Sequence, residues 1–241
     1  FPSLIYNAMI HPIESTKVSG ILWYQGESNE SRAYEYNKSF LLLINSWREK
    51  FGKTTPFYFV QLATYDTPGN SNDGCNWAEL REAQTNALKL ENTGMVVTTD
   101  IGNPKDIHPR NKKTVGERLT NLALKNNLKS PVFNDFSIEG NKIIITFNTK
   151  DVIISKDGKP LTGFEISGTD QKFYPAKAEI KDNKVIVTSS DVPNPVAARY
   201  GWKGDDSENN LFTEKGLPIS PFRTDNFKTI TKDKKFQINL K

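Results

Sequence analysis

The sequence predicts an α/β fold in which a parallel sheet covered by helices is followed by an antiparallel β region. Between residues 18 and 124, short apolar segments with strand character alternate with longer segments of helical spacing. Three strand–helix units in succession are typical of a parallel sheet covered on both faces. After about residue 130, short β-type runs are separated by turn signals at 157–158 and 182–183, which indicate antiparallel pairing.

The first predicted unit consists of an apolar strand over residues 21–24, a polar turn over 25–29 and a helix over 32–51. The helix is predicted because apolar residues recur at intervals of three or four, which places them on one face. They are Phe40, Leu43, Ile44, Trp47 and Phe51. Gly52 and Pro56 are stop signals, so we expect a helix of roughly five turns.

The second unit begins with a buried strand over residues 57–62 and continues with a surface loop over 64–76, which is rich in Gly, Asn, Asp and Pro. The helix that follows has apolar residues at helical spacing, namely Trp77, Leu80, Ala83, Ala87 and Leu88. The third unit is a strand over 95–99, a loop over 100–109 and a helix with one apolar face. That face is formed by Val115, Leu119, Leu122 and Ala123.

Two polar segments follow the first and third predicted strands. Residues 25–29 come directly after the first strand, and residues 100–108 come after the third. Sheets of this kind bind their ligands in the crevice outside the carboxyl ends of the strands. The two segments are therefore predicted to border one crevice.

The second half of the chain is predicted to be rich in β-structure. Short strands are expected over residues 142–147, 152–155 and 184–188, where β-branched side chains are frequent. We place the boundary so that residues 1–128 form the α/β part and residues 129–241 form the β-rich part. The aromatic C-terminal tail is interpreted as packing rather than ligand contact, and it is expected to dock back on the first part.

Composition excludes several classes of function. The net charge of +4 results from 32 basic and 28 acidic residues spread along the chain, without a basic block long enough to follow a nucleic-acid backbone. No apolar run approaches the ~18 residues of a membrane span. A single Cys75 and two histidines favour neither a disulfide framework nor a metal site. We therefore expect no nucleic acid, no membrane, no metal and no cofactor.

An imidazole base must be one of the two histidines. His108 lies in the loop before the last helix of the α/β part, where functional residues are common. Asp106 precedes it by two residues, and a carboxylate there could orient the ring and stabilise its charged form. Asp100 or a main-chain carbonyl could orient the ring instead. His11, followed by Glu14, is interpreted as a hydrogen-bonded structural residue and is the second choice for the base.

The turn after the first strand supplies hydrogen-bond donors. The side-chain amides of Gln25 and Asn29 can donate to a developing oxyanion, beside or in place of main-chain N–H groups. Glu27 lies between these two residues. It could act as a general acid or base, or it could form an ion pair with Arg32 or Arg48 that shapes the loop.

Ser28 is a tempting nucleophile because Gly26, Glu27 and Ser28 begin like a nucleophile elbow. The elbow requires a glycine two residues after the serine, and Glu30 occupies that position. Ser28 is therefore not the predicted nucleophile. The chain supplies a base, its partner and oxyanion donors, and it lacks a serine in the expected context.

Several segments, taken together and in this order, resemble the sialate O-acetylesterases of the SGNH-hydrolase superfamily of carbohydrate esterases. They are residues 6–12 (YNAMIHP), 23–29 (WYQGESN), 107–112 (IHPRNK) and the tail from 199–202 (RYGW) to 221–223 (PFR). The resemblance implies a flavodoxin-like three-layer sandwich and a serine esterase that removes O-acetyl groups from sialic acid. It also implies a secreted or periplasmic protein, with His108 as the base and Gln25 at the oxyanion site beside Gly26, Glu27 and Asn29.

The chain departs from that family in two respects. Family members carry the serine in a Gly-Gln-Ser-Asn block at the end of a first strand, well before the position of Tyr6, and no such block occurs here. We therefore expect a C-terminal part that is inactive alone, that needs the missing N-terminal segment as its partner, and whose sheet is open beside residues 21–24. The family spacing also places Asp three residues before His, where Lys105 stands, so Asp106 is the chosen partner.

Three alternatives stay open at this level. The substrate could be acetylated xylan, because the loop over residues 64–76 lines the pocket and sets that choice. The chain could also be a carbohydrate-binding relative without chemistry, which holds a glycan in the crevice and near Trp202. The third alternative is a glycosidase that uses only the carboxylates of Glu27 and Asp106, and it predicts that His108 is dispensable.

Overall fold

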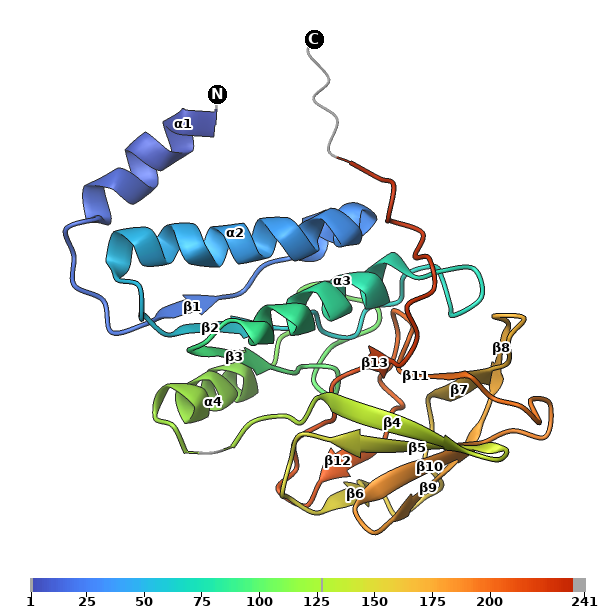
Figure 1. The fold of residues 1–241 in the computed structure, drawn as a ribbon. Coiled ribbons are helices and arrows are strands. Elements are labelled where there is room, and N and C mark those ends of the chain that lie inside the picture. Colours follow the sequence, from blue (N-terminus) through green and yellow to red (C-terminus); the bar gives the residue numbers. More distant parts are fainter. Residues whose placement is uncertain (1, 127, 236–241) are drawn as a thin grey trace.

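The computed structural model describes residues 2–126 and 128–235 and has a mixed α/β architecture (Figure 1). A parallel sheet with its helices comes first along the chain, and antiparallel sheets follow. Both features confirm the predicted fold class. Within the described ranges, no helix combines the length and the apolar character needed to cross a bilayer.

Three parallel strands form the first sheet in the order β1-β2-β3. They are β1 (Ile21–Trp23), β2 (Phe57–Val60) and β3 (Thr93–Val96). Ile21 lies opposite Phe57, and Phe57 lies opposite Thr93. Among the strands that the structure describes, β1 pairs only with β2, and Leu22 at this edge is 59% exposed.

Helices connect the strands and cover the sheet. α2 (Ala33–Phe51) follows β1, α3 (Asn76–Thr85) follows β2 and α4 (Lys112–Ala123) follows β3. The shorter helical segments are α1 (Pro2–Ile5), η1 (Tyr6–Ile10), η2 (His11–Ile13), η3 (Glu27–Arg32) and η4 (Asn86–Lys89). α2 and α3 lie on one face of the sheet, and α4 lies on the other (Figure 1). The helix predicted over 32–51 is confirmed to within one residue.

The two helical layers follow from the alternation of side chains along β2, because successive side chains of a strand point to opposite faces. Phe57 and Phe59 pack against Phe40 of α2 in the main buried cluster. The rings of Phe40 and Phe59 meet edge to face, with centroids 5.1 Å apart. On the opposite face, Val60 packs with Val115 of α4.

The third predicted strand is shifted toward the N-terminus. It was expected over residues 95–99, and β3 spans Thr93–Val96. The Thr98 hydroxyl donates to the Gln61 carbonyl at 2.8 Å, and the Ile101 N–H donates to the Thr98 carbonyl at 3.2 Å. The chain therefore turns at Thr98 instead of continuing the strand, although threonine is a frequent strand residue.

The β-rich part contains antiparallel sheets with the strand orders β4-β5-β10-β9 and β13-β11-β7-β8, and the pair β12-β6. The strands are β4 (Phe133–Glu139), β5 (Lys142–Phe147), β6 (Ile153–Ser155), β7 (Phe164–Ser167), β8 (Phe173–Pro175), β9 (Lys177–Lys181), β10 (Lys184–Thr188), β11 (Ala197–Tyr200), β12 (Leu211–Thr213) and β13 (Phe222–Arg223). The predicted strands correspond to β5, β6 and β10. Alternate residues of β5 and β10 are fully buried, namely Ile143, Ile145, Val185 and Val187.

Residues 223–231, near the end of the described chain, return to the first part of the chain and pack against α3 (Figure 1). Arg223 donates twice to the carboxylate of Glu82, at 2.7 and 2.9 Å. The carboxylate of Glu79 accepts from the main-chain N–H groups of Ile230, at 2.9 Å, and Thr231, at 3.1 Å. The tail is thus attached to α3 by the bidentate Arg223–Glu82 ion pair and by two main-chain hydrogen bonds to Glu79.

A buried ion pair also joins the two parts at the carboxyl end of β2. Arg81 of α3 is fully buried, and its Nη1 lies 3.0 Å from Oδ2 of Asp206. The same guanidinium donates to the carbonyls of Leu62, Ala63 and Lys203, each at 2.9 Å. Burial raises the pKa of Asp206, and the charge of Arg81 opposes that effect.

Candidate functional site

The turn after β1 passes close against α3. Gly26 is buried and has a φ of 157°. A Cβ at this position would lie 3.0 Å from Nε2 of Gln84 and 3.2 Å from Cδ2 of Leu80, so only glycine fits without displacement. The turn continues directly into η3. Residues 25–29 therefore lie together at the carboxyl end of β1, as predicted.

The side chain of Gln25 is held from two sides. Its Nε2 donates to Oδ1 of Asn29 at 2.6 Å, and its Oε1 accepts from the Tyr36 hydroxyl at 3.2 Å. Tyr36 is a buried residue of α2, and burial raises its pKa, so the hydroxyl keeps its proton at neutral pH. A side-chain amide has two N–H groups. The second N–H of Gln25 has no acceptor among the described residues, and it is therefore available to an oxyanion.

His108 lies in the loop between β3 and α4, and its side chain is 90% exposed. Its main-chain N–H donates to Oδ1 of Asp106 at 2.9 Å, whereas its Nδ1 lies 3.9 Å from the same oxygen. Because 3.9 Å exceeds a hydrogen-bond distance, Asp106 shapes the loop here and does not hold the ring. Asp100 binds Arg118 through two bonds of 2.7 Å. No described main-chain carbonyl accepts from the ring either.

A pocket of about 480 Å³ brings the two predicted segments together. The residues that line it are Tyr24, Glu27, Ser28, Ile107, His108, Pro109 and Lys112. His108 and Glu27 therefore share one cavity, as the spacing of the strands predicts. Gln25, Asn29 and Asp106 lie beside the pocket and are not among its lining residues.

Two further residues of this pocket bear on its chemistry. Ser28 is exposed, and its hydroxyl bonds to no described residue. Nζ of Lys112 lies 3.3 Å from the Tyr24 hydroxyl and 4.5 Å from the centre of the Tyr24 ring, which is a cation–π contact. Sequence reasoning assigned no role to Lys112, although it stands four residues after His108 within the segment 107–112.

The other histidine lies at the opposite edge of the sheet. Nδ1 of His11 lies 3.1 Å from Oε2 of Glu14, and Oε1 of Glu14 lies 3.1 Å from Lys50. Hydrogen bonds to Glu14, above all from the Tyr6 hydroxyl, lower the pKa of this carboxyl to about 2. Lys50 belongs to the last turn of α2, which runs back from the carboxyl edge of the sheet (Figure 1). His11 therefore does not meet the residues around His108.

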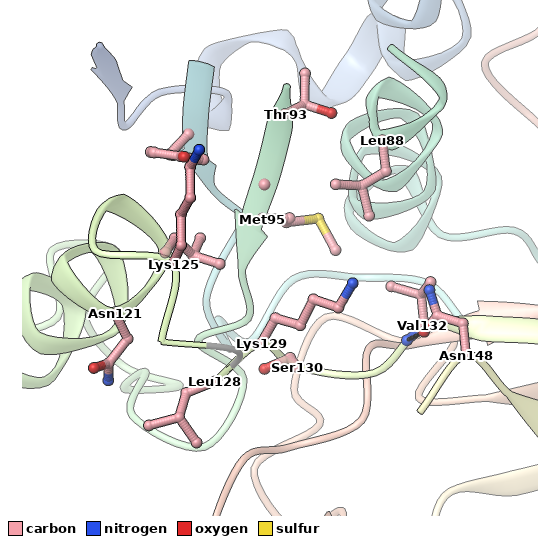
Figure 2. A pocket seen from close by; sticks show the side chains of 13 residues that line it. Leu88, Thr93, Met95, Asn121, Lys125, Leu128, Lys129, Ser130, Val132 and Asn148 are labelled. Atoms are coloured by element: carbon pink, nitrogen blue, oxygen red, sulfur yellow. Dashed lines mark hydrogen bonds between the residues drawn. The ribbon is translucent and has the colours of Figure 1, made fainter. Parts of the chain in front are cut away.

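A second cavity, of about 410 Å³, lies away from the predicted motifs (Figure 2). It is lined by Thr93 at the start of β3, by Lys125 and Lys129 after α4, and by Asn148 after β5. It therefore opens near the amino end of the parallel strands, whereas ligands of such sheets bind at the carboxyl end. It contains no predicted site residue. The described residues also include no group of three His, Cys, Asp or Glu side chains placed to hold a metal ion.

Sequence reasoning missed two residues that contact Gln25. One is Tyr36, and the other is Gln84, whose Nε2 donates to the Gln25 carbonyl at 3.3 Å. A signal for Gln84 exists in the sequence. Arg81 and Gln84 follow Trp77 at intervals of four and seven, so they share the buried face of α3. Polar side chains on a buried helix face must find partners inside the fold.

Comparisons with known proteins find similarity to carbohydrate esterases. The model of a family described as carbohydrate esterase, sialic acid-specific acetylesterase, matches residues 2–125. The sialate O-acetylesterase of Mus musculus is 29% identical, over 91% of this chain and 47% of its own length. The sialate O-acetylesterase of Homo sapiens is 31% identical, over 83% of this chain and 44% of its own length. A carbohydrate acetylesterase structure from Xanthomonas citri has a TM-score of 0.88 and 42% identity, over 92% of this chain and 54% of its own. The chain thus spans about half the length of these proteins.

Proposed function

Because the chain belongs to the sialic acid-specific acetylesterase family of carbohydrate esterases, we propose that it carries the base and the oxyanion donors of an enzyme that removes O-acetyl groups from sialic acid. The observation that carries this proposal is the shared pocket. Glu27 after β1 and His108 after β3 line it together, at the carboxyl edge of the parallel sheet. Folds of this type bind their ligands at that edge.

His108 is the proposed general base. Its exposed ring accepts the proton of a serine hydroxyl while the serine oxygen bonds to the carbonyl carbon of the acetyl group. The tetrahedral intermediate expels the sugar oxygen, which takes the proton back from the imidazolium, and an acetyl-serine is left. The imidazole then takes a proton from a water molecule while the water oxygen bonds to the acetyl carbon. The serine oxygen leaves and takes that proton back from the imidazolium, and the acetic acid that is released ionises to acetate in solvent.

Asp106 is the proposed partner of the imidazolium. Its Oδ1 lies 3.9 Å from Nδ1 of His108, and catalytic hydrogen bonds are often long in unliganded enzymes and shorten in the complex. Asp100 is the weaker candidate, since both of its oxygens are bound to Arg118.

Gln25 is the proposed side-chain donor to the oxyanion. Asn29 and Tyr36 hold its amide in one orientation, which leaves one N–H for the developing charge. Gly26 allows the close turn that places this amide. Glu27 lines the pocket, and the proposed role of its carboxylate is to accept a hydrogen bond from a sugar hydroxyl.

The serine is proposed to lie on a segment of the protein outside these 241 residues. Ser28 shares the pocket with His108, but it lacks the glycine of a nucleophile elbow and bonds to no described residue. The matched relatives are about twice as long as the matched region, so they contain further segments. Such a segment would complete the site from the side of β1, whose outer edge has no strand partner among the described residues.

Sialic acid is the proposed sugar because the pocket presents a cation. Lys112 lies at the start of α4 and offers its charge to the carboxylate of sialic acid, which acetylated xylan lacks. The names of the curated relatives support the same substrate class. We further propose a secreted or periplasmic location, on the resemblance of the motifs alone.

Acetate release from O-acetylated sialic acid by the full-length protein tests the proposal. We expect His108→Ala to lower kcat by about 10³-fold, the contribution of a general base. His11→Ala is the matched control, since it also removes an exposed histidine that precedes a proline. The 241 residues alone should be inactive. If they hydrolyse the ester, and Ser28→Ala abolishes that turnover, the local serine is the nucleophile and the proposal is wrong.

A further inference from the structure

The ladder between β1 and β2 ends before the turn that carries the site. The last paired residues are Trp23 and Phe59. Beyond them the chain leaves the sheet, and three main-chain groups remain between the diverging ends, namely the carbonyls of Gln25 and Val60 and the N–H of Leu62. Buried main-chain groups require partners. The ladder supplies none for these three on the side of β1.

The side-chain amide of Gln84 binds all three groups. Its Oε1 accepts from the Leu62 N–H at 2.8 Å. Its Nε2 donates to the Val60 carbonyl at 3.2 Å and to the Gln25 carbonyl at 3.3 Å. Gln84 is 1% exposed, so this amide lies between the strand ends and is shielded from water.

The contacts allow one orientation of this amide. Both N–H groups of Nε2 are used, each by a carbonyl, and Oε1 faces an N–H. A flipped amide would place its oxygen against two carbonyls and its nitrogen against a donor. The amide of Gln84 therefore ties the Gln25 carbonyl to β2 from within the fold, and the Tyr36 hydroxyl of α2 is a second, longer donor to the same oxygen, at 3.5 Å.

The Gln25 carbonyl belongs to the peptide group that joins Gln25 to Gly26. In a trans peptide the C=O and N–H groups point in opposite directions, and the described chain contains no cis peptide. Because the carbonyl is turned toward Gln84 of α3, the Gly26 N–H is turned away from α3. No described residue accepts a hydrogen bond from this N–H.

We propose that Gln84 is a positioning residue for the oxyanion site. It holds the peptide between Gln25 and Gly26 so that the Gln25 side-chain amide and the Gly26 N–H are both presented to the developing charge. This inference rests on the proposed esterase function. It adds a buried residue of α3 that touches neither substrate nor serine and acts through the turn.

Gln61 provides a matched control. It is also a fully buried glutamine packed against α3, and its Nε2 donates to the Arg81 carbonyl and to the hydroxyls of Thr85 and Ser220. None of these partners belongs to residues 21–29. Gln84→Met and Gln61→Met each remove a buried amide from the same helix–strand interface, so a general loss of packing affects both proteins alike.

The kinetic test uses the full-length protein and O-acetylated sialic acid. We expect Gln84→Met to lower kcat by about 100-fold, because a misplacement of about 1 Å in a catalytic group has that effect. KM should change far less, and Gln61→Met should keep the wild-type kcat. If Gln84→Met does not fold, Gln84→Glu takes its place, since it keeps the volume and the acceptor for the Leu62 N–H. Equal kcat values for the variants at the two positions, or an unchanged kcat at position 84, overturn the proposal.

Hydrogen exchange in the same proteins separates this inference from the esterase proposal. We expect amides in residues 24–30 to exchange about tenfold faster in Gln84→Met, and at the wild-type rate in Gln61→Met. A wild-type protein without esterase activity would contradict the proposed function, and exchange would still decide whether Gln84 holds the turn. Equal exchange in both variants overturns the positioning role whatever the activity.

Discussion

Replacing Arg81 with Met removes one partner of the buried ion pair that joins the two parts of the fold. Asp206 is 1% exposed, so its carboxylate would stay buried without a cation. The Thr64 hydroxyl would remain as its neutral partner. Breaking a buried pair by removing one charge costs about 3–5 kcal/mol.

The guanidinium also supplies donors to main-chain carbonyls. Those of Leu62, Ala63 and Lys203 each accept from it at 2.9 Å, and Met fills much of the volume without replacing these bonds. We therefore expect a total loss near the upper end of the range, about 5 kcal/mol. In a protein of this size, that loss lowers Tm by roughly 10–20 °C.

Urea unfolding of the wild type, Arg81→Met and the double variant Arg81→Met/Asp206→Leu measures this effect. The double variant should regain part of the loss, because no unpaired charge is left in the interior. The pH dependence has a defined sign. Burial raises the pKa of Asp206, so the penalty for its charge is full above that raised pKa and fades as pH falls toward the unfolded value of about 3.9.

Three results would refute this reasoning. A loss below about 1 kcal/mol in Arg81→Met would mean that the pair behaves like an exposed one. A double variant that is less stable than Arg81→Met would mean that the unpaired carboxylate is not the source of the loss. A deficit that grows as the pH is lowered would contradict the assigned direction of the Asp206 pKa.

Other predictions concern the turn and the tail. Gly26→Ala should cost about 1–3 kcal/mol of stability and lower kcat, because the new methyl group meets the amide of Gln84. Gly116→Ala, in an open position of α4, should instead increase the free energy of unfolding by up to ~1 kcal/mol and so raise Tm. Tyr36→Phe removes the hydroxyl that contacts both the side-chain and the main-chain oxygen of Gln25, so we expect a fall in kcat with a stability loss of about 1 kcal/mol, measured by thermal unfolding. Glu79→Ala frees two main-chain N–H groups of the tail, and limited proteolysis should then cut residues 226–235 faster while the core stays intact.

The helices and the shared pocket could be predicted because their signals are local. Apolar residues at helical spacing define α2 to within one residue of its N-terminus. The meeting of Glu27 and His108 follows from their positions after parallel strands, since the carboxyl ends of such strands form one edge. These inferences need only the spacing along the chain and a general property of sheets.

The contacts of individual polar groups could not be predicted, because they depend on distances in the folded chain. Asp100 looked like a candidate partner of His108, and it is bound to Arg118 on α4, eighteen residues later. Thr98 looked like a strand residue, and its hydroxyl bonds across to the Gln61 carbonyl where the chain turns. In both cases a tertiary hydrogen bond overrides the local preference.

The attachment of the tail to α3 has a consequence for how the protein is made. Arg81 and Asp206 are separated by 125 residues, Glu82 and Arg223 by 141, and Glu79 and Thr231 by 152. Synthesis at about 5–20 residues per second leaves α3 without these partners for roughly 6–30 seconds after it has been synthesised. During that interval Arg81 lacks its carboxylate partner, and Glu79 lacks its hydrogen-bond donors from the tail. We therefore expect the α/β part to reach its full stability only after residues 206–231 have been synthesised and have packed against α3.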